Sequence, residues 1–193
     1  NLGLLDRFLL QMEYKDIPVI IGFNKCDLVE DARIRELEKI YEASGYPMVF
    51  VSVKESKYLE GLKELLSGKT TALAGPSGVG KSSLMNWLLP EASMETGDVS
   101  EKIKRGRHTT RHSELFHIGE RTYLFDTPGF SSLYLNDFTD ETLKHYFPEF
   151  LNYEETCRFT GCNHINEPDC GVKNAMEEGK ISPVRYEHYV QMY

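Results

Sequence analysis

A glycine-rich stretch has the residue types of a phosphate-binding loop. Residues 75–82 read GPSGVGKS and fit the pattern G-x-x-x-x-G-K-[ST] at every fixed position. Glycines let backbone N–H groups approach an anion without a Cβ in the way, and a helix expected from Lys81 onward adds the positive end of its dipole. The alternative, a chance glycine-rich turn, is disfavoured by the strand and helix signals on either side. The residues expected to contact phosphate are Gly75, Ser77, Gly78, Val79, Gly80, Lys81, Ser82 and Ser83.

A second polar loop has the residue types that recognise guanine. Asn24-Lys25-Cys26-Asp27 directly follows an apolar run at 19–23. The Asp27 carboxylate can accept hydrogen bonds from guanine N1–H and the 2-amino group, Asn24 suits the O6/N7 side, and the Lys25 stem can lie over the ring. Adenine lacks those two donors, so a buried Asp27 would discriminate between the purines. Alone, this motif could equally be a turn. The segment Ser52-Val53-Lys54 follows the next apolar run and is similar to a second guanine-binding loop.

Further residues have the types needed to bind Mg²⁺ and to contact the γ-phosphate of a nucleotide. Lys81 is predicted to reach the β- and γ-phosphates and the Ser82 hydroxyl to ligate Mg²⁺. Asp126-Thr-Pro-Gly129 follows another apolar run; Asp126 is predicted to hold a metal-bound water and the Gly129 N–H to sense the γ-phosphate. Thr109 and Thr110 are the candidates for the threonine that ligates Mg²⁺, and the spacing does not choose between them.

The residue that follows the Asp126 motif cannot orient a water molecule. It is Phe130, where many GTPases have Gln, and an apolar ring makes no hydrogen bond to water. His108, within a basic run at 102–112, is the best candidate for the catalytic group. The alternative is that His108 contacts solvent or RNA, which a histidine on a basic loop also suits.

Three cysteines and a histidine cluster near the C-terminus. Cys157-x4-Cys162-x-His164-x5-Cys170 supplies three thiolates and an imidazole, which match a closed, four-coordinate structural Zn²⁺ site. A small helical unit with little core gains stability from such a metal. Buried cysteines without a ligand are the alternative.

The elements that must position these loops indicate an α/β fold. Short apolar runs alternate with amphipathic segments, and the polar motifs follow the runs, which is typical of a mostly parallel sheet with helices on both faces. Residues 1–135 are expected to form this domain, and 136–193 a small helical zinc-binding domain. The net charge of −8 over 193 residues argues against non-specific nucleic-acid binding by the whole surface, and the sequence contains no apolar run long enough to span a membrane.

The order of the motifs differs from that of Ras-like GTPases, because Asn-Lys-x-Asp precedes the phosphate loop. Circular permutation accounts for this order, since domain termini often lie close together. The order, with GPSGVGKSS, GRHTTRH, DTPGF and CRFTGCNHINEPDC, closely resembles the circularly permuted ribosome-assembly GTPases of the RsgA/YjeQ type. The resemblance points to His108 as the catalytic group. It also implies an N-terminal OB-fold domain, absent from this sequence, and a sheet in which one strand is missing or supplied from outside it.

These residues are compatible with three functions. The first, whose ribosomal part comes from the resemblance, is a monomeric cytoplasmic GTP hydrolase that binds the small (30S) ribosomal subunit and its rRNA and assists late maturation. Its hydrolysis is expected to be stimulated by the subunit. The second is a nucleotide-gated RNA- or ribosome-binding module with negligible hydrolysis, which Phe130 favours. The third, an ATP-using kinase, leaves Asn24 and Asp27 without a purpose.

Overall fold

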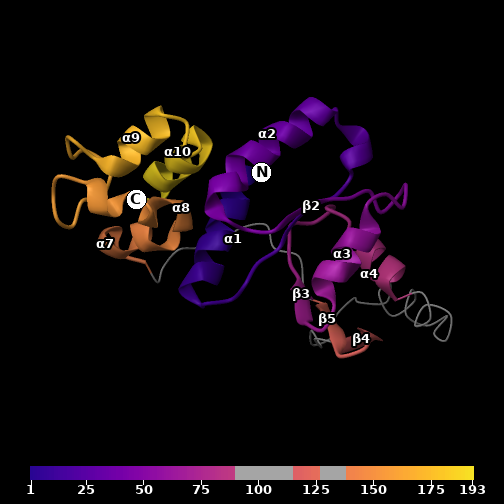
Figure 1. The fold of residues 1–193 in the computed structure, drawn as a ribbon. Coiled ribbons are helices and arrows are strands. Elements are labelled where there is room, and N and C mark those ends of the chain that lie inside the picture. The colour runs from indigo at the N-terminus through magenta and orange to yellow at the C-terminus, as the bar shows by residue number, and fades with distance from the viewer. Residues whose placement is uncertain (90–114, 127–137) are drawn as a thin grey trace. The chain divides into compact units, whose positions relative to one another are not determined.

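The computed structural model describes residues 1–89, 115–126 and 138–193 (Figure 1). The chain divides into two compact units, each assembled from separate segments. The first unit comprises 1–22, 29–48 and 132–193, and the second comprises 23–28 and 49–131. Within the described ranges, no helix has the length and apolar character needed to cross a bilayer.

A three-stranded sheet forms the centre of the second unit. Strand β3 (Thr70–Leu73) lies beside β5 (Thr122–Asp126) in parallel, and β4 (Leu115–Gly119) pairs with the other edge of β5 in antiparallel orientation. Helices α3 (Leu59–Leu66) and α4 (Lys81–Leu88) flank β3 in the sequence. The β3–β5 register places the last residues of both strands side by side, so the loops that follow them begin at the same edge of the sheet.

A separate two-stranded sheet contains β1 (Ile21–Phe23) and β2 (Met48–Phe50). The two strands run parallel: the Ile21 N–H donates to the Pro47 carbonyl over 2.9 Å, and the Val51 N–H donates to the Phe23 carbonyl over 2.8 Å. No strand pairing joins the two sheets in the part of the chain that the structure describes. The α/β class and the parallel pairing predicted from the sequence are confirmed. The missing strand stays a prediction.

The first unit is helical. Its α-helices range from one turn to more than three turns and are separated by short turns. They are α1 (Leu2–Tyr14), α2 (Asp31–Tyr41), α7 (Asp140–Leu143), α8 (Pro148–Leu151), α9 (Gly171–Glu177) and α10 (Pro183–Met192), with 3₁₀ turns η2 (Glu42–Ser44), η3 (Lys144–Tyr146) and η4 (Glu154–Thr156). Gly45 ends the α2–η2 segment in the left-handed conformation (φ 74°), which a glycine adopts without a Cβ penalty.

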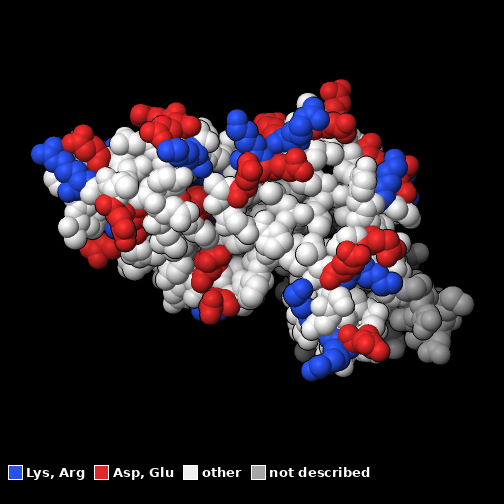
Figure 2. All heavy atoms as spheres, in the orientation of Figure 1, with Lys and Arg blue, Asp and Glu red and all other residues white. Residues whose placement is uncertain are grey.

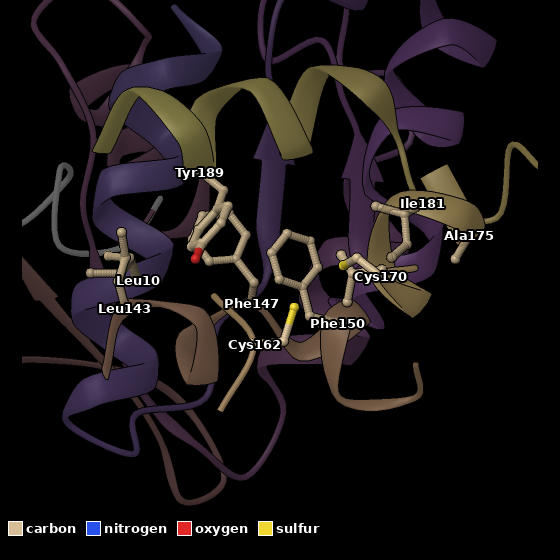
Figure 3. Close-up of a cluster of buried hydrophobic side chains, with 10 residues drawn as sticks. Leu10, Leu143, Phe147, Phe150, Cys162, Cys170, Ala175, Ile181 and Tyr189 are labelled. Atoms are coloured by element: carbon tan, nitrogen blue, oxygen red, sulfur yellow. The ribbon is translucent and has the colours of Figure 1, made fainter. Parts of the chain in front are cut away.

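An aromatic cluster forms the core of this unit (Figure 3). Phe147 and Phe150 stack with 5.1 Å between ring centroids, and Tyr189 of α10 meets both rings edge-on. Leu10 of α1 is buried in the same cluster. The N-terminal helix therefore packs with the C-terminal helices, although the sequence predicts that they belong to different domains. The functional boundary at 135/136 stays a prediction.

A buried ion cluster also holds the first unit together. The Arg185 guanidinium donates to Asp6 Oδ1 over 2.7 Å and to both Glu149 carboxylate oxygens, at 2.7 and 3.1 Å. All three side chains are almost completely buried. The buried residues of α1 are Asp6, Leu9 and Leu10, so this charged side chain lies on the same buried face as two leucines.

Candidate nucleotide site and metal centre

The 24–27 loop and the 75–82 loop touch each other in the second unit. Asn24 Nδ2 donates to the Val79 carbonyl over 2.9 Å, and Lys25 Nζ donates to the Gly78 carbonyl over 2.8 Å. Lys25 has a left-handed backbone (φ 67°). Two stretches about fifty residues apart in the sequence are thus joined at the carboxyl ends of their strands, as expected for loops that follow parallel strands.

Asn24 also holds the third predicted loop. Its Oδ1 accepts hydrogen bonds from the Lys25 N–H over 2.7 Å and from the Val53 N–H over 3.2 Å. The sequence places Asn24 on the O6/N7 side of guanine, whereas the structure commits both ends of its amide to backbone groups. The side chain joins the three loops to one another, and this is the physical reason that a side-chain amide with a donor and an acceptor suits this position.

Asp27 has a free acceptor where Asn24 does not. Asp27 Oδ1 is buried and, among the described residues, without a hydrogen-bond partner. A buried acceptor left unpaired is costly and points to a donor supplied from outside the chain. The Ser52 hydroxyl hydrogen-bonds to the Asp27 side chain and lowers the pKa of this carboxyl, with smaller contributions from Lys54 and Lys57. Asp27 is therefore ionised at neutral pH and can only accept.

The phosphate loop has the predicted backbone. Gly78 (φ 81°) and Gly80 (φ 99°) are left-handed, and α4 begins at Lys81. A Cβ on Gly80 would lie 2.3 Å from Asn24 Nδ2, so this position needs glycine both for its conformation and for the close approach of the guanine loop. Ser82 is exposed in the first turn of α4. Ser77 and Ser83 are also exposed.

Lys81 lies folded over the loop. Its Nζ donates to the carbonyls of Gly75, over 2.7 Å, and Pro76, over 3.0 Å. The ammonium group is therefore already placed above the loop backbone, where an anion would find a positive charge. Asp126 ends β5 directly beside Leu73, the last residue of β3, so its backbone lies next to the start of the phosphate loop. His108, Thr109, Thr110 and Gly129 lie outside the described residues, as does Phe130.

The cysteine–histidine cluster of the first unit converges on one point. The four ligand atoms of Cys157, Cys162, His164 and Cys170 all lie within 4.8 Å of one another. The Cys157 and Cys170 sulfurs are 3.9 Å apart, and His164 Nδ1 lies 3.6 Å from the former and 3.3 Å from the latter. A tetrahedral zinc ion with ordinary bond lengths requires about 3.8 Å between sulfurs and about 3.5 Å between sulfur and nitrogen. The donor set and its spacing therefore fit zinc.

The surroundings of this cluster are arranged for thiolates. The Gly171 N–H donates to Cys157 Sγ over 3.3 Å, and the His164 N–H donates to Cys162 Sγ over 3.4 Å. Burial raises the pKa of the Cys162 thiol to about 12 and lowers the pKa of His164. Without a metal these groups are uncharged, so a bound cation would displace thiol protons. Cys162 and Cys170 also belong to the aromatic core, which ties the metal site to the packing of the unit (Figure 3).

The sequence did not single out the contacts that stabilise this site. Lys144 Nζ, buried, donates to the Cys162 carbonyl over 2.8 Å, and the Glu167 carboxylate accepts from the N–H groups of Asn163 and Ile165. Residue type alone does not distinguish a lysine or glutamate that makes such contacts from one that is exposed to solvent.

Comparison with known proteins gives a consistent picture over the whole chain. A family model described as RsgA GTPase matches residues 1–136. A protein of Agathobacter rectalis named "Small ribosomal subunit biogenesis GTPase RsgA" is 55% identical over 193 residues, which are 100% of this chain and 64% of that protein. The protein of the same name in Clostridium perfringens strain SM101 is 48% identical over 99% of this chain and 66% of its own length. The chain thus spans just under two thirds of these relatives.

Two solved structures share the fold. The crystal structure of YjeQ from Thermotoga maritima superposes with a TM-score of 0.80 at 42% identity and covers 100% of this chain and 64% of that one. The structure of YloQ, described as a circularly permuted GTPase, superposes with a TM-score of 0.78 at 38% identity, over 99% of this chain and 61% of that one. The circularly permuted order predicted from the motifs is confirmed by this likeness.

Proposed function

Since this chain belongs to the RsgA GTPase family, we propose that it binds GTP between residues 24–27 and 75–82 and hydrolyses it to GDP and phosphate. The observation that carries the proposal is the pair of hydrogen bonds from Asn24 and Lys25 to the carbonyls of Val79 and Gly78. A base-reading loop that touches a phosphate loop can hold both ends of one nucleotide.

Each loop has a separate task in this site. Asp27, with its unpaired Oδ1, accepts from guanine N1–H and the 2-amino group, and Ser52 holds the carboxylate in place. The backbone N–H groups of 75–82 bind the phosphates, and Lys81 moves from the loop carbonyls to the β- and γ-phosphates. Ser82 and Asp126 would hold Mg²⁺, Asp126 through a water molecule; bound Mg²⁺ neutralises charge that develops on the phosphates.

The metal of the first unit is proposed to be one structural Zn²⁺ ion held by Cys157, Cys162, His164 and Cys170. Four protein ligands leave no open position, so the ion stabilises the helical unit and takes no part in hydrolysis. The spacing of the sulfur and nitrogen atoms supports this assignment.

The partner is proposed to be the small ribosomal subunit and its rRNA. The chain is proposed to act as a monomer in the cytoplasm. The names of the relatives support the small subunit as partner. The basic run at 102–112, which lies outside the described residues, is the segment whose charge suits RNA phosphates. On the face seen in Figure 2, acidic and basic side chains are interspersed, with no broad basic area. The charge of this face therefore does not by itself favour RNA.

Hydrolysis measured with and without the subunit tests this proposal. Purified protein is given radiolabelled GTP under single-turnover conditions, alone, with small subunits and with large subunits. We expect acceleration by small subunits only. His108→Ala is expected to lower the accelerated rate, with His112→Ala in the same basic run as the matched control. Tight GTP binding without hydrolysis in all three conditions would instead identify a nucleotide-gated binding module.

A further inference from the structure

The His164 imidazole presents one nitrogen to the metal site and the other to an acid. Nδ1 lies 3.3 Å from Cys170 Sγ and 3.6 Å from Cys157 Sγ, while Nε2 lies 3.6 Å from Glu154 Oε1. The His164 side chain is 1% exposed and that of Glu154 is 27% exposed. Nδ1 is therefore the nitrogen in position to bind a metal, and Nε2 faces away from it.

Metal ligation decides where the proton of this ring resides. A neutral imidazole binds a metal through the lone pair of one nitrogen and carries its proton on the other, which must then find an acceptor. With Nδ1 as ligand, that donor is Nε2. Nε2 of His164 and Oε1 of Glu154 are both buried and both without a hydrogen-bond partner among the described residues. Their 3.6 Å separation is longer than a hydrogen bond, and a shift of roughly half an ångström would satisfy both atoms.

The surroundings leave Glu154 as the acceptor for this proton. The Phe150 ring meets the imidazole edge-on at 5.8 Å and offers no acceptor in the ring plane. Tyr186 donates to the His164 carbonyl and so fixes the backbone rather than the ring. His145 Nδ1 lies 3.8 Å from the same Glu154 oxygen, but its side chain is 52% exposed and can be hydrated instead.

We propose that Glu154 is a positioning residue for the metal centre: its carboxylate accepts the Nε2 proton of His164 and thereby holds Nδ1 toward the ion. The inference rests on the proposed zinc site and deepens it. Glu154 begins the 3₁₀ turn η4, and its carbonyl accepts from the N–H of Cys157, so one turn carries both the carboxylate and a thiolate ligand. Such a partner orients the ring and makes it a stronger ligand.

The control variant comes from the same turn. Glu155 is the next residue, carries the same charge and is exposed. Glu154→Ala, Glu154→Gln and Glu155→Ala are prepared in the full chain, and zinc affinity is measured by competition with a chromophoric chelator. We expect Glu154→Ala to bind zinc about 10- to 100-fold more weakly than the wild type, and Glu155→Ala to stay within about twofold. Glu154→Gln, whose amide oxygen still accepts, is expected to lose less affinity than Glu154→Ala.

A second measurement separates orientation of the ring from general stability. In the zinc-loaded protein, imidazole ¹H–¹⁵N spectra report the Nε2 proton of His164, which we expect to be shifted downfield in the wild type and in Glu155→Ala, and to move upfield in Glu154→Ala. Equal zinc affinity and equal Nε2 proton shifts in Glu154→Ala and Glu155→Ala overturn the inference. A wild-type chain that binds no zinc contradicts instead the proposed metal site, so the two failures are distinguishable.

Discussion

The side-chain amide of Asn24 donates a hydrogen bond to the backbone carbonyl of Val79 over 2.9 Å, across 55 positions of sequence. Because the oxygen of the same amide accepts from Lys25 and Val53, one side chain joins the guanine loop, the phosphate loop and the Ser-Val-Lys loop. The three loops of the proposed nucleotide site are thus joined by contacts of this chain alone.

Truncation of Asn24 should loosen this arrangement. Asn24→Ala removes three hydrogen bonds that join the loops, each with a net contribution of about 1 kcal/mol. Nucleotide binding must then offset the part of this energy needed to order the loops again, so we expect affinity for GDP to fall by about 10- to 100-fold. Titration with a fluorescent GDP analogue measures the change. Asn86→Ala, on an exposed position of α4, is the control and should bind like the wild type. Equal affinities for the two variants would show that the contact has no part in binding.

Gly80 should tolerate no side chain. A Cβ there would meet Asn24 Nδ2 at 2.3 Å in a backbone conformation with φ 99°. Gly80→Ala is therefore expected to weaken nucleotide binding by at least about 10-fold, through left-handed strain and displacement of Asn24. Gly61→Ala, in α3 with nothing within 4 Å, should leave binding unchanged and stabilise the fold by about 0.5–1 kcal/mol. Combining Gly80→Ala with Asn24→Ala should add little further loss, and full additivity would refute the coupling.

The contact between the glycine loop and the Asn24 loop could be expected from local rules. Each loop follows the carboxyl end of a strand, which is where the loops of an α/β fold gather, and Val79 and Asn24 do meet. That a nucleotide binds there stays a prediction. The use that Asn24 makes of its amide could not be predicted, because residue type does not determine which of several nearby partners a side chain chooses.

The buried ion cluster of Arg185, Asp6 and Glu149 could not be predicted from the sequence. Arg185 and Asp6 are 179 positions apart, and neither lies in an apolar pattern. Charged residues are usually exposed, so nothing in the sequence marks Asp6 or Arg185 as buried. Glu154 was missed for a similar reason: in an acidic segment, nothing in the sequence distinguishes the carboxylate beside His164 from the exposed one at Glu155.

Removal of the central charge of this cluster should be strongly destabilising. Arg185→Met removes the guanidinium that pairs with the buried carboxylates of Asp6 and Glu149, although His188 still contacts Asp6, so we expect the free energy of unfolding to fall by about 3–5 kcal/mol. Arg33→Met breaks an exposed ion pair with Glu36 and should cost less than about 1 kcal/mol. Urea unfolding of the zinc-loaded protein, followed by far-UV circular dichroism, compares the two. Similar midpoints would mean that the buried cluster contributes no more than a surface pair.

Zinc content should depend on the cluster cysteines and not on the remaining one. Cys162→Ser removes a buried ligand, and we expect it to lower bound zinc below one ion per chain and to reduce the helicity of the C-terminal segment. Cys26→Ser, at the free cysteine of the guanine loop, should retain the metal. Elemental analysis after extensive dialysis makes the measurement. Zinc retained in full by Cys162→Ser would exclude this residue from the metal site.

The most direct test of one shared guanine-nucleotide site is competition between GTP, ITP and ATP for the wild type, Asp27→Ala and Lys81→Ala. It is performed at neutral pH, where Asp27 is ionised because its pKa is lowered by the Ser52 hydroxyl. The wild type is predicted to prefer GTP over ATP by at least about 100-fold, and over ITP, which lacks the 2-amino group, by about 10-fold. Asp27→Ala should lose these preferences, and Lys81→Ala should lose affinity for all three nucleotides. Wild-type affinity and base preference in Asp27→Ala would contradict the account.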